Sequence, residues 1–304
     1  MLGSLLVFGF VLLSAVRDVY FGHIFQSVGF LKVVLIACTI CTVFFLTVSG
    51  LRGALSVLRG NLGIVVAVNV TTAVAWISYF FALTHISPAV ANTLYSGIGP
   101  LTILMLEAVG WRIVARGPVG RGEAIFFVGL ALSLAMIGAG AVTGLTGVSG
   151  VALRYSVAGT AFAVLGGVSL VISILYTRKL HDRGAGSDAI LGVRFILIVF
   201  VTAAAEGFAE RSLWSFAETE LAWLGLSGAV LIVMPIYILQ LGIARSVPLT
   251  ANIIRALGPI VVFATQLADP RITFSGYSLC ALSLYAICVI GANLVRARAA
   301  LKPV

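Results

Sequence analysis

Hydrophobic positions in this chain fall into ten long runs, and polar positions are concentrated in the short stretches between them. Each run holds about 20 predominantly apolar residues, the length that a helix needs to cross the hydrocarbon core of a bilayer. The pattern predicts spans near 3–25, 28–49, 62–82, 88–109, 122–143, 152–176, 188–208, 221–243, 248–268 and 274–296. We therefore expect an all-α integral membrane protein with ten transmembrane helices.

The composition of the 304 residues agrees with this prediction, because 61% are hydrophobic and only 10% are charged. A soluble globular chain is about 25% charged, so the lipid bilayer is the expected partner of this surface. The net charge of +9 would also suit a nucleic-acid-binding protein. The basic residues are thinly spread, however, and form no dense patch with interleaved aromatic residues. We expect no nucleic-acid partner.

Basic residues concentrate in alternate connections between the runs. Lys and Arg favour the short cytoplasmic loops of membrane proteins, and a cytoplasmic N-terminus places most of the basic residues on that side. These residues are Arg52, Arg59, Arg112, Arg116, Arg121, Arg178, Lys179, Arg183, Arg245, Arg296, Arg298 and Lys302. The first run has no preceding Lys or Arg and no small-residue cleavage site after it, so we expect a retained helix. Both termini are therefore expected in the cytoplasm.

One phrase, Pro-x-x-Ala-Asn followed by Gly-Pro, occurs twice inside the apolar runs, over 88–100 and 248–259. Two further correspondences keep nearly the same offset: Lys32 with Arg194, and Glu107 with Gln266. Helices interrupted by Pro and Gly at corresponding positions of two halves point to the binding region of a secondary transporter. Division into 1–145 and 146–304 gives five helices in each half. Because five is odd, the halves are expected to cross the membrane in opposite directions, as inverted repeats.

The segments ISPAVANTLYSGIGPLTILML and SVPLTANIIRALGPIVVFATQLADPRIT resemble EamA-type members of the drug/metabolite transporter superfamily. The basic residues that open the second and seventh helices, and the ten-helix count, extend the resemblance over nearly the whole chain. The chain departs from the family at the cytoplasmic end of the fourth helix, where Trp111-Arg112 replaces the usual Glu, and Asp269 stands near the equivalent place in the second half. The resemblance implies a bacterial inner-membrane protein that exports amino acids or related compounds by alternating access.

Charged residues inside the spans are the first candidates for a substrate site, because an isolated ionised side chain at mid-bilayer costs at least ~2.5–3.5 kcal/mol. Arg17 and Asp18 lie in the first run, and Tyr20 continues the Arg17 face. We interpret them as lining the cavity, with Arg17 holding an anionic group and Asp18 a cation or proton. An ion pair that marks the outer boundary is the alternative.

Arg255 is a second candidate, four residues before Pro259 and three after Asn252 on the same helical face. Proline removes one helical hydrogen bond and frees the carbonyl four residues back, so a cation, an amide and a loosened backbone coincide here. We interpret Arg255 and Asn252 as substrate-binding residues. A structural Arg255 paired with Glu107 or Asp18 is the alternative.

Further polar and aromatic positions at helical spacing complete the expected substrate site: Asn69, Trp76 and Tyr79 in the third span, Asn92 and Tyr95 in the fourth, and Tyr237 in the eighth. An interfacial aromatic belt is the alternative for Trp76 and Tyr79. Asp18 and Glu107 are candidates for proton coupling, because a desolvated carboxyl has a raised pKa. A snorkelling boundary acid is the alternative for Glu107.

Catalytic chemistry is not expected, because no convergent nucleophile or metal cluster is present. The three His residues are scattered, and the four Cys residues lie inside apolar runs as apolar filler. We expect no metal and no cofactor. The phosphate-binding G-x-x-x-x-G-K-[ST] motif is absent, which argues against a primary pump.

The sequence therefore predicts a secondary active transporter, an exporter of a small polar, amino-acid-like metabolite that is zwitterionic or bears carboxylates. Alternatives within the superfamily are a multidrug carrier, a nucleotide-sugar carrier and an exporter of an amino-acid-derived metal chelator. A passive channel and an intramembrane enzyme are alternatives of a different class. The sequence leaves open whether the protein is a monomer or a homodimer.

Overall fold

The apolar runs form helices, and the described part of the chain contains ten helical spans long and apolar enough to cross a membrane. The computed structural model describes residues 2–25, 28–111, 120–148, 150–208 and 218–300. Its elements are α1 (Leu2–Ile24), α2 (Phe30–Leu58), α3 (Leu62–His85), α4 (Pro88–Gly97), α5 (Gly99–Ala108), α6 (Arg121–Val142), α7 (Leu153–Asp182), α8 (Ser187–Arg194), α9 (Ile196–Phe208), α10 (Glu218–Gly228), η1 (Ala229–Val233), α11 (Met234–Ala244), α12 (Pro248–Ala256), α13 (Gly258–Gln266) and α14 (Gly276–Ala300).

This all-helical architecture confirms the predicted fold class and the count of ten spans, and it is that of a multi-pass membrane protein. Some helices run further than expected. The second was predicted to end near residue 49, where Gly50 adopts φ 68° and kinks the helix, but the helix resumes and continues to Leu58. The sixth span, which forms α7, was predicted to end near residue 176 but continues to Asp182.

Besides the kinked second span, four of the described spans are interrupted. The fourth and ninth spans break at Ile98 and Leu257, each just before a Gly-Pro pair. The proline has no N–H to give to the carbonyl four residues back, so the helix ends and a new one starts. The seventh span breaks at Phe195, with no proline nearby, and the eighth passes through the π-helical turn η1 just before Pro235.

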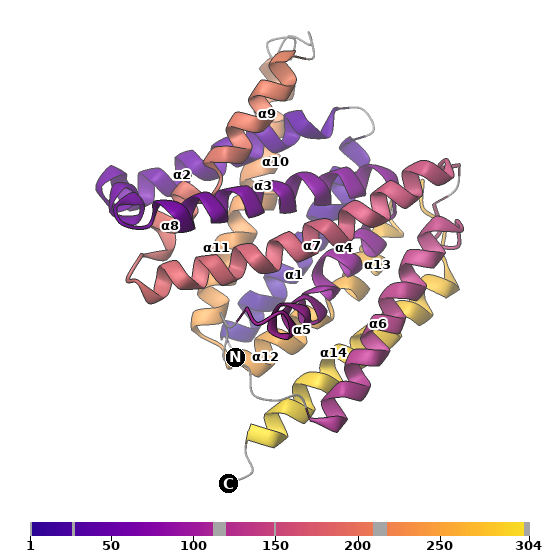
Figure 1. The fold of residues 1–304 in the computed structure, drawn as a ribbon. Coiled ribbons are helices and arrows are strands. Elements are labelled where there is room, and N and C mark those ends of the chain that lie inside the picture. The colour runs from indigo at the N-terminus through magenta and orange to yellow at the C-terminus, as the bar shows by residue number, and fades with distance from the viewer. Residues whose placement is uncertain (1, 26–27, 112–119, 149, 209–217, 301–304) are drawn as a thin grey trace.

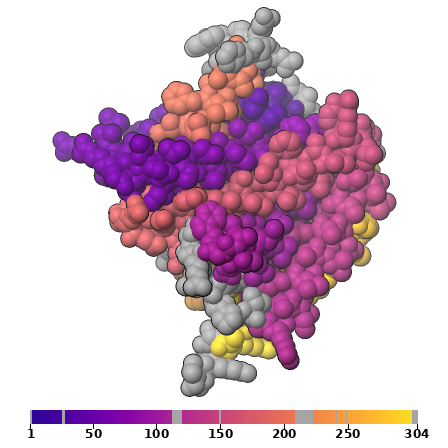
Figure 2. Space-filling view, viewed as in Figure 1, coloured from indigo at the N-terminus to yellow at the C-terminus, as the bar shows by residue number. Residues whose placement is uncertain are grey.

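Helices distant in sequence pack as pairs (Figure 1). α3 lies along α7, α6 lies along α14, and α2 lies against α8 and α9. α1 packs against α11, α12 and α13 and also touches α3 and α4. Figure 2 shows the side chains of α3, α7 and α6 forming the near face of the molecule. A buried core that includes Phe21, Phe25 and Phe80, with rings 5.3–6.0 Å apart, joins α1 to α3.

Two names are used below for the ends of this bundle. The Asp269 end is where α1, α3 and α13 finish and α4 begins. The Glu107 end is the opposite one, where α5 finishes and α12 begins.

Candidate functional site

Arg17 and Asp18 pair with each other inside the bundle. Nε and Nη2 of Arg17 donate to Oδ1 of Asp18 at 2.8 and 2.7 Å. Asn92 of α4 donates from Nδ2 to the second carboxylate oxygen of Asp18 at 2.8 Å. The Asp18 side chain is fully buried and that of Arg17 is 12% exposed. The pair therefore ties α1 to α4 in the interior, and it neutralises its own charge.

Aromatic side chains of α3 and α4 surround this pair. The rings of Tyr79 and Tyr95 lie 4.2 Å apart, and the Tyr79 hydroxyl is 3.4 Å from Nδ2 of Asn92. The guanidinium of Arg17 lies 5.9 Å from the ring centre of Trp76, within reach of a cation–π interaction. Trp76 and Tyr79 are buried. They belong to the interior of the bundle and not to an aromatic belt on its surface.

Asn69 completes the broken backbone of the seventh span. In an unbroken helix the N–H of Leu197 would donate to the carbonyl of Val193, four residues earlier. Here the Asn69 side chain takes the place of that bond: Oδ1 accepts from the Leu197 N–H at 3.0 Å, and Nδ2 donates to the Val193 carbonyl at 2.9 Å. Nδ2 also donates to the Val65 carbonyl at 3.0 Å. Asn69 therefore stabilises the α8–α9 break.

Arg194 ends α8 at this break, and its partners are neutral. Nε donates to Oγ1 of Thr72 at 2.9 Å and Nη2 donates to Oγ of Ser173 at 3.2 Å. The two hydroxyls are themselves 2.8 Å apart and fully buried. Arg194 is not among the substrate-binding residues predicted from the sequence. Its position inside an apolar span, the same signal that selected Arg17 and Arg255, would have found it.

Arg255 and Asn252 lie on an accessible face of α12. α12, which carries Arg255, packs on α14. Tyr285 of α14 packs so closely over Gly97 that an added Cβ would be 2.6 Å from its ring. Arg255 therefore lies on a helix that contacts α14, and α14 covers the accessible Ser96 and the break in the fourth span. Neither Ser96 nor Tyr285 was selected from the sequence.

Three other sequence-selected residues lie apart from these groups. Tyr237 is 49% exposed, beside Ile40 and Phe44 on a separate apolar groove. The Tyr20 hydroxyl and Oε1 of Glu107 are buried and have no hydrogen-bond partner among the described residues. Glu107 is the last residue but one of α5.

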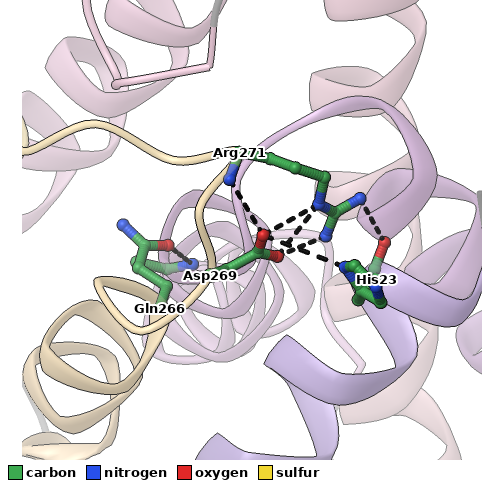
Figure 3. Close-up of polar contacts among 6 residues, drawn as sticks. His23, Gln266, Asp269 and Arg271 are labelled. Carbon is green, nitrogen blue, oxygen red and sulfur yellow. Dashed lines mark hydrogen bonds and ion pairs between the residues drawn. The ribbon is translucent and has the colours of Figure 1, made fainter.

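An Asp–Arg network closes the Asp269 end (Figure 3). The Arg271 guanidinium faces the Asp269 carboxylate and forms an ion pair with it, while Nη1 of Arg271 donates to the Gly22 carbonyl at 3.1 Å. His23 approaches the same carboxylate at 3.9 Å. Gln266 accepts at Oε1 from the Ala89 N–H, at 3.0 Å, in the first turn of α4. α1, α4 and α13 are thereby held together.

The hydrogen bonds from Arg271 lower the pKa of Asp269 below its ordinary value, while partial burial opposes this shift. Asp269 therefore remains ionised at neutral pH. The network is therefore an ion pair at neutral pH.

A groove of about 510 Å³ between α4, α5, α6 and α7 is lined almost entirely by apolar side chains, among them Leu94, Ile98, Leu134 and Val164. None of the sequence-selected site residues lines it. Acyl chains of the bilayer fit such a surface. Within the described ranges, no group of three or more His, Cys, Asp or Glu side chains could hold a metal ion.

Comparison with known proteins adds the fold alone. No family model matches the chain, and no curated protein matches it. Among solved structures, one described only as "Crystal structure of protein" superposes with a TM-score of 0.61 at 20% sequence identity. The alignment covers 99% of this chain and 99% of that one. The two proteins therefore share their overall fold over the full length.

Proposed function

We propose that the protein is a secondary active transporter that works by alternating access. Its cargo is a small polar metabolite, zwitterionic or carboxylate-bearing, which it exports across the bacterial inner membrane. In this proposal the chain is an EamA-type carrier of the drug/metabolite transporter superfamily. It consists of two inverted five-helix repeats, 1–145 and 146–304, with both termini in the cytoplasm.

Packing between the helices supports the repeat. If α4 and α5 correspond to α12 and α13, and α7 to α1, then each contact in one half should have a counterpart. α4 packs on α7 and α6, and the corresponding α12 packs on α1 and α14. α5 packs on α7, and α13 packs on α1. α3 packs on α7, and the eighth-span helix α11 packs on α1.

Some contacts have no counterpart, and the position of one of them, between α4 and α13, supports alternating access. α13 packs against α4 at the Asp269 end, but the corresponding pair, α5 and α12, makes no comparable contact among the described residues. In the proposed topology the Asp269 end faces outward. The structure then corresponds to a carrier closed to the outside and open to the cytoplasm. If the contact between α4 and α13 opened and one between α5 and α12 formed, the carrier would open to the outside and close to the cytoplasm.

The observation that carries the proposal is the placement of polar groups at the two broken spans. Asn92, Tyr95 and Ser96 precede the break in the fourth span, and Asn252 and Arg255 precede the break in the ninth. Asn252, Arg255 and Ser96 are accessible. Polar groups near the midplane of a membrane at paired helix breaks are where secondary transporters bind their cargo.

The test compares metabolites in the medium of cells that express the protein with those of cells that lack it. Expression should raise the external level of at least one carboxylate-bearing metabolite, and Arg255→Gln and Asp18→Asn should reduce that rise. Arg154→Gln is the control, because Arg154 is an exposed residue in the first turn of α7. Equal media with and without the protein would refute export.

A passive channel is separated from a carrier by uphill movement. Proteoliposomes under an imposed pH gradient should accumulate the identified metabolite above its external concentration, and collapse of the gradient should release it. Equilibration without accumulation would indicate a channel.

A further inference from the structure

Arg194 carries a positive charge that the described residues do not neutralise. Its side-chain hydrogen-bond partners, Thr72 and Ser173, are hydroxyls. A guanidinium has five N–H donors, so these two bonds leave three donors without a protein acceptor in the described part of the chain. Arg194 is also partly accessible. The two hydroxyls accept hydrogen bonds from Nε and Nη2. The remaining N–H groups of the guanidinium are available to an acceptor on a bound molecule.

Arg255 is the second unneutralised cation. It is accessible and has no ion pair with an acid among the described residues. The charge of Arg17, by contrast, is neutralised by its ion pair with Asp18. The acids of the seventh span, Asp188 and Glu206, are six residues before and twelve residues beyond Arg194, about 9 and 18 Å of helix, and neither forms an ion pair with it among the described residues. The region around the helix breaks therefore has two uncompensated positive charges, one on α8 and one on α12.

The two cations flank the same short segment of α4. Arg194 donates to Ser173 of α7, six residues beyond Gly167, where α7 packs against Tyr95. α12, which carries Arg255, packs on α14, whose Tyr285 ring lies over Gly97, next to Ser96. Tyr95 and Ser96 are adjacent in sequence, directly before the break in the fourth span. One bound molecule that lies across this segment can therefore approach both cations.

We infer that Arg194 and Arg255 bind two separate carboxylates of one cargo molecule, so that the transported compound is a small organic dicarboxylate. This inference rests on the proposed transport function and names its substrate class. An Arg fork matches the two oxygens of a carboxylate. Each cation supplies a single charge, which one carboxylate balances, so two separate carboxylates balance the two cations.

The test measures binding of simple dicarboxylates to the purified full chain in detergent, by calorimetry and by the shift in Tm. The probes are the straight-chain series from malonate to suberate, each paired with the monocarboxylate of equal carbon number. We expect at least one dicarboxylate to bind about tenfold or more tightly than its partner, the factor that one charge-assisted hydrogen-bonded pair supplies. If no dicarboxylate exceeds its monocarboxylate partner, the inference is wrong.

Variants assign the binding to the two residues. Arg194→Gln and Arg255→Gln should each remove most of the preference for the dicarboxylate, Arg194→Lys should retain part of it, and Arg154→Gln should leave it unchanged. A purely structural Arg194 would lower Tm in the Gln variant and leave the preference intact, which would overturn its assignment. Should Arg194→Gln fail to fold, Arg194→Lys and Arg255→Gln still decide the question.

Transport in proteoliposomes separates this inference from the function on which it rests. Accumulation of zwitterions with no preference for dicarboxylates would leave a carrier and refute the substrate class. Dicarboxylate binding without uphill accumulation of any probe would support the two-arginine site and refute the carrier.

Discussion

At the scale of single residues, three asparagines with the same side chain have three different surroundings. Asn69 is bonded into the α8–α9 break, Asn92 donates to the Asp18 carboxylate, and Asn252 is accessible on α12. Each was expected to contact the cargo. A buried amide whose donors and acceptor already have partners gains little from a ligand. This description applies to Asn69. Asn92 is partly buried and its Nδ2 is engaged by Asp18 and Tyr79, whereas the exposed Asn252 side chain has no hydrogen-bond partner among the described residues.

Replacement of Asn69 by Ala should destabilise the protein by about 2–4 kcal/mol, because the Val193 carbonyl and the Leu197 N–H both lose their partner in the interior. The measurement is thermal unfolding in detergent. Asn293→Ala is the matched control, because its amide donates to the Val289 carbonyl in its own helix, and it should cost less than about 1 kcal/mol. Equal losses in the two variants would contradict the bridging role of Asn69.

At the scale of helices, close approach between α7 and the break in the fourth span depends on small residues. Gly159, Ala163 and Gly167 lie at four-residue spacing on one face of α7, and Ala163 is fully buried. A Cβ on Gly159 would lie 3.1 Å from His85, and one on Gly167 would lie 2.4 Å from the Tyr95 carbonyl oxygen. These small residues therefore let α7 pack closely against α3 and α4.

Gly167→Ala should therefore destabilise the protein by about 1–3 kcal/mol, the usual cost of overpacking, since the added methyl group meets backbone that cannot turn away. Gly9→Ala is the control, because a methyl group added at that position of α1 would have no neighbouring atom within 4 Å. That variant should gain about 0.5–1 kcal/mol from helix propensity. Unfolding transitions of the two purified variants provide the comparison, and a neutral Gly167→Ala would show that the two helices can separate freely.

At the scale of the whole molecule, the ten spans could be predicted from hydrophobicity because a lipid-facing surface must be apolar along its length. The Gly-Pro breaks in the fourth and ninth spans could be anticipated from proline chemistry. The break at Phe195 could not, because its cause is Asn69, a residue more than a hundred positions away that replaces a backbone bond. Helical periodicity likewise led us to include Tyr237 in the expected substrate site. Periodicity alone does not show that this side chain lies on an exposed face, apart from the other candidates.

The network at the Asp269 end gives the molecule a testable pH dependence. The unfolded carboxyl has a pKa of about 3.9 and the folded value is lower, so the folded state binds its proton less readily. Asp269 therefore contributes its full stabilisation above about pH 4, and this contribution is lost as the pH falls through the lowered pKa. In a His23→Gln background, which removes the nearby imidazole, the Tm difference between Asp269 and Asp269→Asn should stay constant from pH 7 to 5. It should shrink below pH 4. A difference that disappears between pH 7 and 5 would contradict the assignment.

The central claim, access to one site from alternate sides of the membrane, is tested most directly by labelling position 96. Ser96 is accessible beside the break in the fourth span, and Ser96→Cys would be placed in a chain whose own Cys38, Cys41, Cys280 and Cys288 are replaced. A membrane-impermeant thiol reagent would be applied from each side separately. Thr273→Cys and Arg52→Cys serve as markers for the two ends, since both positions are exposed.

Each marker should react from one side alone, Thr273→Cys from outside and Arg52→Cys from inside. Ser96→Cys should react from both sides, in cells and in inverted vesicles, and faster from the inside because the Glu107 end is the open one. Labelling of Ser96→Cys from a single side, with both markers behaving as stated, would contradict alternating access.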